Sequence, residues 1–514
     1  MNIRQEQTFL CTEDYPIVET AAGKVHGFVD GDVFCFRGME YAQAERFQEP
    51  RPVKPWEGVK KAFDYSYGCP EMTYSLQGKE PGGSLMIAQR FWHMSEHVQN
   101  LNVWTKSIDK EAKRPVMVWM HGGGYAAGSA THLYSYEGWE MAHAYDVVVV
   151  TVNHRLNMLG FLDLSAFGER YRHSGNLGMA DLVAALHWVR DNIASFGGDP
   201  DNVTIYGQSG GGGKVTTLMQ MPAADGLYHK VIAQSGVMRM GPDSSRAGEL
   251  AQKAVANLGL TPQTIQEIET VPYEKLSAAV QQAAQELGLP PFGAWAPVPD
   301  GDYYVGNAFD VGFRKETAHI PMIVGSCLSE FDSSPVGDKS RWTDDQRKAV
   351  VEARFGSEAG RVMEAYANAY PEVDVSYAAA VDRRVRPAVL EFTALRNRDA
   401  KAPVFNYIFA FESTFLGGQL PGHNGDLHFM FHNAFGQEAM RKEGVTGPLQ
   451  DAMAGAWAAF AETGSPNGPG LPQWEPHTAE KPTTMLYGDH SHQVVGHDAE
   501  LMEVLAALPK PLVI

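Results

Sequence analysis

Short apolar runs alternate with longer stretches of helical spacing through the first half of the chain. Residues 115–120 (PVMVWM) and 146–152 (DVVVVTV) have the length and apolar character of strands buried on both faces of a sheet. Between residues 178 and 196 the apolar side chains instead recur every three or four positions, as on one face of a helix. This alternation predicts a mainly parallel sheet with helices packed on its faces.

Weaker patterns extend this arrangement toward both ends. Residues 18–37 contain short β-rich runs separated by glycines, which is typical of a meander at a sheet edge. Further strands are expected at 101–105, 230–234 and 321–325, and helices at 245–288, 342–370 and 376–398. We therefore expect a single α/β domain over residues 1–514, with helical lobes at roughly 245–290 and 340–400.

The stretch 202–214 (NVTIYGQSGGGGK) places Ser209 in a G-x-S-x-G frame between a short strand and a helix. Such a turn holds the serine oxygen at the edge of a sheet, beside a helix N-terminus that favours negative charge. The motif alone is weak evidence in a chain with 52 glycines. A phosphate-binding loop is excluded, because Gln208 and Val215 occupy the positions where that loop needs glycine and Ser/Thr.

A second glycine motif, HGGG at residues 121–124, directly follows the predicted strand 115–120. A serine nucleophile needs N–H donors for the oxyanion that it creates. The amides of Gly123 and Gly124, with that of Gly210 after the serine, would form a three-donor oxyanion hole. The alternative is a flexible loop without a chemical role.

Charge and cysteine usage narrow the class of protein. The net charge of −19 argues against nucleic acid as a partner and disfavours anionic substrates. No apolar run approaches the length of a membrane span, and the first 20 residues lack a signal-peptide core. The cysteines Cys11, Cys35, Cys69 and Cys327 have neither metal-ligand spacing nor a disulfide pattern. We expect a cytoplasmic protein with free thiols and no membrane partner.

Longer strings along nearly the whole chain carry a family resemblance. They include VETAAGKVHG, HGGGY, VNHRLNMLGF, the segment SGNLGMADLVAALHWVRDNIASFGGDPDNVTIYGQSGGG, VIAQSG, WAPVPDG, VGSCLSEF, GHNGDLHFMF and WAAFAETGSPN. With these strings the chain resembles the type B carboxylesterases, the cholinesterase and para-nitrobenzyl-esterase-like family of α/β-hydrolases. The resemblance implies an α/β-hydrolase fold with helical lobes around an active-site gorge.

The resemblance also implies the partners of Ser209. In VGSCLSEF it places the acid at Glu330, with Asp332 as the weaker alternative, and in GHNGDLHFMF it places the base at His423. His428 and His432 lie at other positions of that string, and the residues alone cannot choose among 18 histidines. The order serine, acid, histidine is that of α/β-hydrolases. Ser235 in VIAQSG resembles a buried serine of the triad region, although a plain structural serine is the alternative.

The function implied is a serine carboxylesterase that works through an acyl-enzyme, without metal or cofactor, on a small, neutral and largely apolar ester. A monomer or small homo-oligomer is expected. An amidase, carbamate hydrolase or lactonase with the same triad, and a non-catalytic binding protein on this fold, are the alternatives. Aromatic residues that could line the substrate pocket, or simply pack in the core, are Trp92, Tyr125, Phe292, Trp295 and Phe415, beside Phe91 and Leu416.

The chain departs from the family pattern at several positions. Cys69 has no partner, because residues 95–98 read SEHV where the family often has a cysteine. Gln208 stands where an acid is common, Gly210 where alanine is common, and Phe331 replaces the usual glycine after the acid. The loop at 40–47 is shorter than usual. The resemblance assigns Arg46, Glu96 and Arg155 to structural ion pairs.

Overall fold

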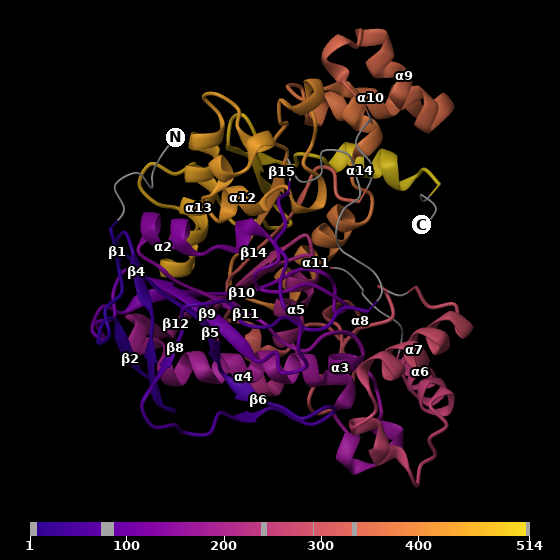
Figure 1. The fold of residues 1–514 in the computed structure, drawn as a ribbon. Coiled ribbons are helices and arrows are strands. Elements are labelled where there is room, and N and C mark those ends of the chain that lie inside the picture. The colour runs from indigo at the N-terminus through magenta and orange to yellow at the C-terminus, as the bar shows by residue number, and fades with distance from the viewer. Residues whose placement is uncertain (1–7, 73–86, 238–243, 291, 332–336, 510–514) are drawn as a thin grey trace.

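The computed structural model describes residues 8–72, 87–237, 244–290, 292–331 and 337–509. Its main feature is a 12-stranded sheet in the order β1-β4-β5-β9-β11-β10-β12-β13-β14-β15-β16-β17, parallel from β11 to β16 and antiparallel at both edges (Figure 1). In chain order the strands of this sheet are β1 Phe9–Leu10, β4 Phe28–Asp30, β5 Val33–Glu40, β9 Asn100–Thr105, β10 Arg114–Met120, β11 Val148–Val152, β12 Gly198–Gln208, β13 Lys230–Gln234, β14 Met322–Cys327, β15 Val404–Phe409, β16 Thr483–Tyr487 and β17 His492–Val495. The predicted parallel sheet is confirmed.

Two small sheets and 13 α-helices complete the described chain. The small sheets pair β2 Ile17–Glu19, β3 Lys24–His26 and β8 Val59–Lys61, and β6 Ala42–Gln43 with β7 Arg51–Pro52. The helices are α2 Trp139–Tyr145, α3 Asn157–Phe161, α4 Leu177–Asn192, α5 Gly210–Leu218, α6 Ser244–Asn257, α7 Tyr273–Glu286, α8 Ala308–Val311, α9 Asp344–Phe355, α10 Ala359–Ala369, α11 Val385–Asp399, α12 Leu427–Met430, α13 Thr446–Thr463 and α14 Ala499–Ala506. None of these helices is long and apolar enough to cross a membrane.

The apolar run of strand β10 has no polar face because both faces of the strand are buried there. It pairs with β11 on one side and β12 on the other, and its alternate side chains enter two different cores. Val118 belongs to the cluster that contains Leu182 of α4, while Trp119 belongs to the cluster that contains Trp457 of α13. Helices thus cover both faces of the sheet, as Figure 1 shows for α4 and α13.

The helical lobes lie outside the sheet (Figure 1). Helices α6 and α7 pack against each other in one lobe, and α9 and α10 build the other. The expected helices at 245–288 and 342–370 are each two helices with a break between them. The prediction at 376–398 was wrong over its first part, where residues 375–380 form a 3₁₀ turn and α11 begins only at Val385.

Candidate active site

Ser209 lies on the sharp turn between β12 and α5. Its backbone has φ 59° and ψ −126°, a combination that costs energy for a residue with a side chain. The turn is held on both sides: the Ser209 N–H donates to Gln234 O over 2.8 Å, and its carbonyl accepts from the Gly213 N–H over 3.0 Å. The strand, strained turn and helix expected from the motif are all present.

The HGGG loop follows β10 and touches this turn through its backbone. Gly123 has φ +91°, and a Cβ there would lie 2.1 Å from the carbonyl oxygen of Ala127. A Cβ on Gly210 would lie 2.4 Å from the nitrogen of Gly124. A side chain at either place would force the backbone to shift, and two of the three expected amide donors lie side by side next to Ser209.

Glu330 lies just after β14, and His423 lies in the 3₁₀ turn Gly422–Asn424 in the segment after β15; the fold brings the two together. The Nδ1 atom of His423 is hydrogen-bonded to Oε2 of Glu330. The other carboxylate oxygen accepts from Ser235 Oγ over 2.7 Å and from the Cys327 N–H over 2.8 Å. Ser235 thus contacts Glu330, the residue that the resemblance proposes as the acid.

The alternative residues for the acid and the base either have other partners or lie outside the residues that the structure describes. Asp332 lies outside the described residues. His428 is hydrogen-bonded to Asn433, and His432 to Asp451. Of the three histidines in this string, His423 is the one paired with Glu330.

Burial decides the protonation of this pair. It lowers the pKa of His423 to about 4, against the opposing charges of Asp426 and Asp382. It also raises the pKa of Glu330, which the hydrogen bonds from Ser235 and Cys327 oppose. His423 is consequently a neutral imidazole at pH 7. Its Nε2 atom is buried and has no hydrogen-bond partner within the described chain.

Gln208 is a site residue whose role the sequence did not reveal. Its Nε2 atom donates to the carbonyl oxygen of His423 over 2.6 Å, so the residue before Ser209 holds the backbone of the histidine. Asp426 also belongs to this buried region, where it accepts hydrogen bonds from Tyr407 over 2.7 Å and Gln234 over 3.0 Å. The roles of these two residues follow from contacts between distant parts of the chain, which no local sequence pattern contains. The only hint in the sequence was the glutamine at position 208, where the family commonly has an acid.

Lys214 lies behind the glycine loop and does not reach the proposed chemistry. Its Nζ donates to the carbonyl oxygen of His121 over 2.9 Å, which ties α5 to the end of β10. Burial lowers its pKa to about 7. The buried rings of His121, His132 and His154 lie close to one another in the same region, and burial lowers the pKa of each of them.

The aromatic residues proposed for the substrate pocket separate into two groups. Tyr125 and Trp295 are 3% and 2% exposed and belong to the core, so they offer no surface to a ligand. Trp92 is half-buried with its ring near His132, and Phe415 is half-buried in a 3₁₀ turn. Phe292 is 40% exposed, and its ring lies 3.0 Å from where a Cβ of Gly124 would be. Among the five, Phe292 is the one placed against the expected oxyanion loop.

The expected structural ion pairs are present. Arg46 Nε donates to Glu96 Oε2 over 2.7 Å, and Arg155 binds Asp181 through two hydrogen bonds of 2.7 and 2.8 Å. Cys69 is a buried free thiol. These residues belong to the scaffold around the loop at 40–47.

One group of described residues has the arrangement of possible metal ligands: His173, Asp300 and Asp302. Asp300 is already hydrogen-bonded to His173 over 3.0 Å, and Arg172 pairs with Asp302. The arginine places a positive charge where a cation would bind. The contacts of this group are therefore those of an ion-pair cluster.

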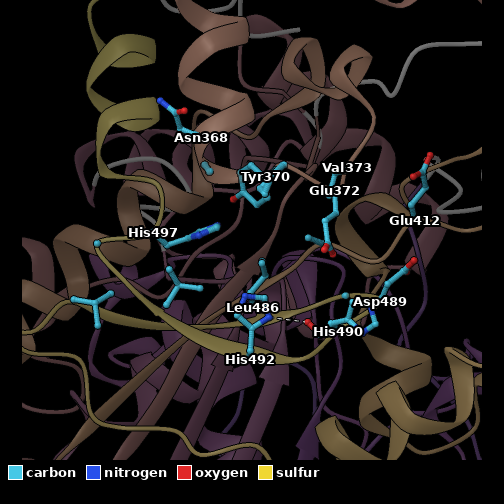
Figure 2. A pocket seen from close by; sticks show the side chains of 17 residues that line it. Asn368, Tyr370, Glu372, Val373, Glu412, Leu486, Asp489, His490, His492 and His497 are labelled. Carbon is cyan, nitrogen blue, oxygen red and sulfur yellow. Dashed lines mark hydrogen bonds between the residues drawn. The ribbon is translucent and has the colours of Figure 1, made fainter. Parts of the chain in front are cut away.

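A cavity of about 450 Å³ lies between the end of α10 and the β16–β17 hairpin (Figure 2). Its walls combine apolar side chains such as Tyr370 and Leu486 with acidic residues and histidines such as Glu372 and His497. None of the residues proposed for the triad or the oxyanion hole lines this cavity.

Comparisons with known proteins agree with this geometry. The sequence profile of the carboxylesterase family matches residues 14–502. The para-nitrobenzyl esterase of Bacillus subtilis (strain 168) is 32% identical over 484 residues, which cover 92% of this chain and 94% of that protein. The phenmedipham hydrolase of Pseudarthrobacter oxydans is 30% identical, with 93% and 96% covered.

Solved structures extend the likeness to the fold. An esterase from Clostridium hathewayi, described as able to hydrolyse aliphatic aromatic polyesters, has a TM-score of 0.90 and 39% identity, with 98% of this chain and 100% of that chain covered. A para-nitrobenzyl esterase structure has a TM-score of 0.76 at 29% identity, with 96% and 100% covered. With the α/β-hydrolase sheet described above, these matches establish that the chain belongs to the carboxylesterase family and is a carboxylic ester hydrolase.

Proposed function

We propose that the chain hydrolyses small carboxylic esters through an acyl-enzyme on Ser209. His423 Nε2 takes the hydroxyl proton while the serine oxygen attacks the ester carbonyl carbon. Glu330 keeps the Nδ1 proton in place and stabilises the imidazolium that forms. The imidazolium then protonates the departing alcohol, and water releases the acid by the same cycle in reverse roles.

In this mechanism, backbone amides stabilise the negative charge that develops on the carbonyl oxygen. The N–H groups of Gly123, Gly124 and Gly210 are the proposed donors. The N-terminus of α5, which begins at Gly210, adds a favourable partial positive charge.

The environment of His423 carries the proposal. One ring nitrogen is bound by Glu330, and the other is buried without a partner in the described chain. Gln208, the residue before Ser209, donates to the carbonyl oxygen of His423. A neutral imidazole whose Nε2 atom has no partner in the described chain, and whose backbone is bound by the residue before Ser209, is suited to act as a general base.

Replacement of the nucleophile tests this mechanism. We expect Ser209→Ala to lower kcat for p-nitrophenyl butyrate on the order of 10⁶-fold and to abolish covalent labelling by a fluorophosphonate. Mass spectrometry of the labelled wild-type protein should place the adduct on residue 209. Ser165→Ala, which changes an exposed serine, serves as the control. A Ser209→Ala protein that keeps the wild-type rate would rule the mechanism out.

A preference for aromatic esters is a narrower function that we also propose. Phe292 lies against Gly124, and Phe331 lies against His423, with 40% and 49% of these residues exposed. Flat rings bind well against such exposed aromatic faces. The likeness to an esterase described as acting on aliphatic aromatic polyesters agrees with this preference.

The ratio of kcat/KM for an aromatic and an aliphatic ester measures this preference. Phe292→Ala should lower kcat/KM for p-nitrophenyl benzoate more than for p-nitrophenyl butyrate. The p-nitrophenyl ring is common to both esters, and only the benzoate has an acyl ring that can lose a stacking partner. Phe435→Ala, which removes another 45% exposed phenylalanine, should leave the ratio of the two rates unchanged. An unchanged ratio in Phe292→Ala would contradict the preference.

A further inference from the structure

Phe331, the residue directly after the proposed acid, packs on the ring of the proposed base. The centroids of the Phe331 and His423 rings are 4.1 Å apart, and their planes are inclined by 36°. The His423 side chain is only 14% exposed. Phe331 is itself 49% exposed, so one part of it faces solvent while its ring covers a face of the imidazole.

The other contacts of His423 leave this ring face to Phe331. Glu330 binds the Nδ1 edge, Gln208 binds the backbone carbonyl, and the Cys327 thiol lies 3.9 Å from the same carbonyl. The carboxylates of Asp426 and Asp382 add negative charge nearby. These groups hold the edge and the backbone of the histidine, whereas the phenylalanine contacts the flat of the ring.

We propose that Phe331 is a positioning residue for His423: its ring holds the imidazole in the orientation that Glu330 sets and excludes water from one face. This inference rests on the proposed role of His423 as the base. An aromatic ring at this distance restricts rotation of its neighbour. It also contributes to the burial that keeps the imidazole uncharged. A glycine after the acid, as is usual in the family, has no side chain to do either.

The pH profile of kcat/KM distinguishes positioning from a bulk structural effect. In Phe331→Ala water reaches the imidazole, so the imidazolium is better solvated and the acid limb should move up toward the ordinary histidine value of about 6.5. We expect kcat for p-nitrophenyl butyrate to fall about 10-fold, because a loosely held base is misaligned, with KM nearly unchanged. Phe331→Tyr keeps the ring and should restore both the acid limb and kcat.

Two controls keep the result specific. Fluorophosphonate titration of active sites and thermal melting show whether Phe331→Ala folds, and Phe435→Ala removes an equally exposed ring elsewhere. An unchanged acid limb and kcat in folded Phe331→Ala would overturn the inference, and so would a loss confined to KM. Labelling of Ser209 in the wild-type protein tests the proposed function separately, so failure of the one is distinguishable from failure of the other.

Discussion

At the scale of single residues, the contact between Gly210 and the glycine loop constrains the residue that directly follows Ser209. A methyl group on Gly210 would meet the backbone oxygen and nitrogen of Gly124 at 2.3 and 2.4 Å. The loop must then move away, and its N–H groups lose their alignment on the developing oxyanion. We therefore expect Gly210→Ala to lower kcat on the order of 10²-fold, with little change in KM, in assays with p-nitrophenyl butyrate.

Gly360→Ala is the matched control for this substitution. Gly360 lies in α10, where an added Cβ meets no other atom within 4 Å. Its kcat should equal that of the wild type. If Gly210→Ala also kept full activity, the loop would be able to retreat without cost, which would contradict this prediction.

At the scale of secondary-structure elements, the sequence predicted the elements whose environment is uniform. β10 and β11 are apolar because both their faces are buried, and the apolar side chains of α4 recur at helical spacing although most of its residues are buried. By contrast, β15 (VFNYIF) was missed because Asn406 interrupts its apolar run. This buried amide accepts a hydrogen bond of 2.6 Å from Arg386, a tertiary contact that no local pattern contains.

Helix α13 was missed for the opposite reason. Its central part, GAWAAFA, is apolar on every side, so it lacks the periodicity by which a surface helix is recognised. The helix packs between the sheet and α12, and both sides need apolar contacts. A helix cannot be predicted from the spacing of polar and apolar residues where none of its faces is exposed to solvent.

The candidate site likewise combines features that the local sequence predicts with contacts that it does not. The strained turn at Ser209 and the HGGG loop are local features, and their residue types predict their geometry. Glu330 and His423 lie 93 residues apart, and only family resemblance paired them in advance. The contact of Gln208 with His423, and that of Phe331 with the same ring, depend on how β12, β14 and β15 align in the folded sheet.

At the scale of the whole molecule, the buried bases behind the glycine loop predict sensitivity to acid. Burial lowers the pKa of His154, and neither of its ring nitrogens has a hydrogen-bond partner in the described chain. Below about pH 6.5 the unfolded state therefore binds a proton that the folded state resists. Each such proton lowers the free energy of unfolding by about 1.4 kcal/mol per pH unit until the folded group also titrates.

Urea unfolding at pH 7.5 and pH 5 measures this effect. His154→Phe keeps a ring of similar size without a titrating nitrogen, so it should lose less stability on acidification than the wild type. His490→Phe alters an exposed histidine and should lose as much as the wild type. Equal losses in His154→Phe and the wild type would contradict this assignment of the acid sensitivity.

The spacing of the three proposed catalytic residues also affects how the enzyme comes into being. Ser209, Glu330 and His423 follow β12, β14 and β15, which are made in that order. A nascent chain that has passed residue 330 carries the proposed nucleophile and the proposed acid but not the proposed base. If these residues act as proposed, ester hydrolysis begins only after residue 423 has been synthesised, and its onset during translation reports that the segment after β15 has paired with Glu330.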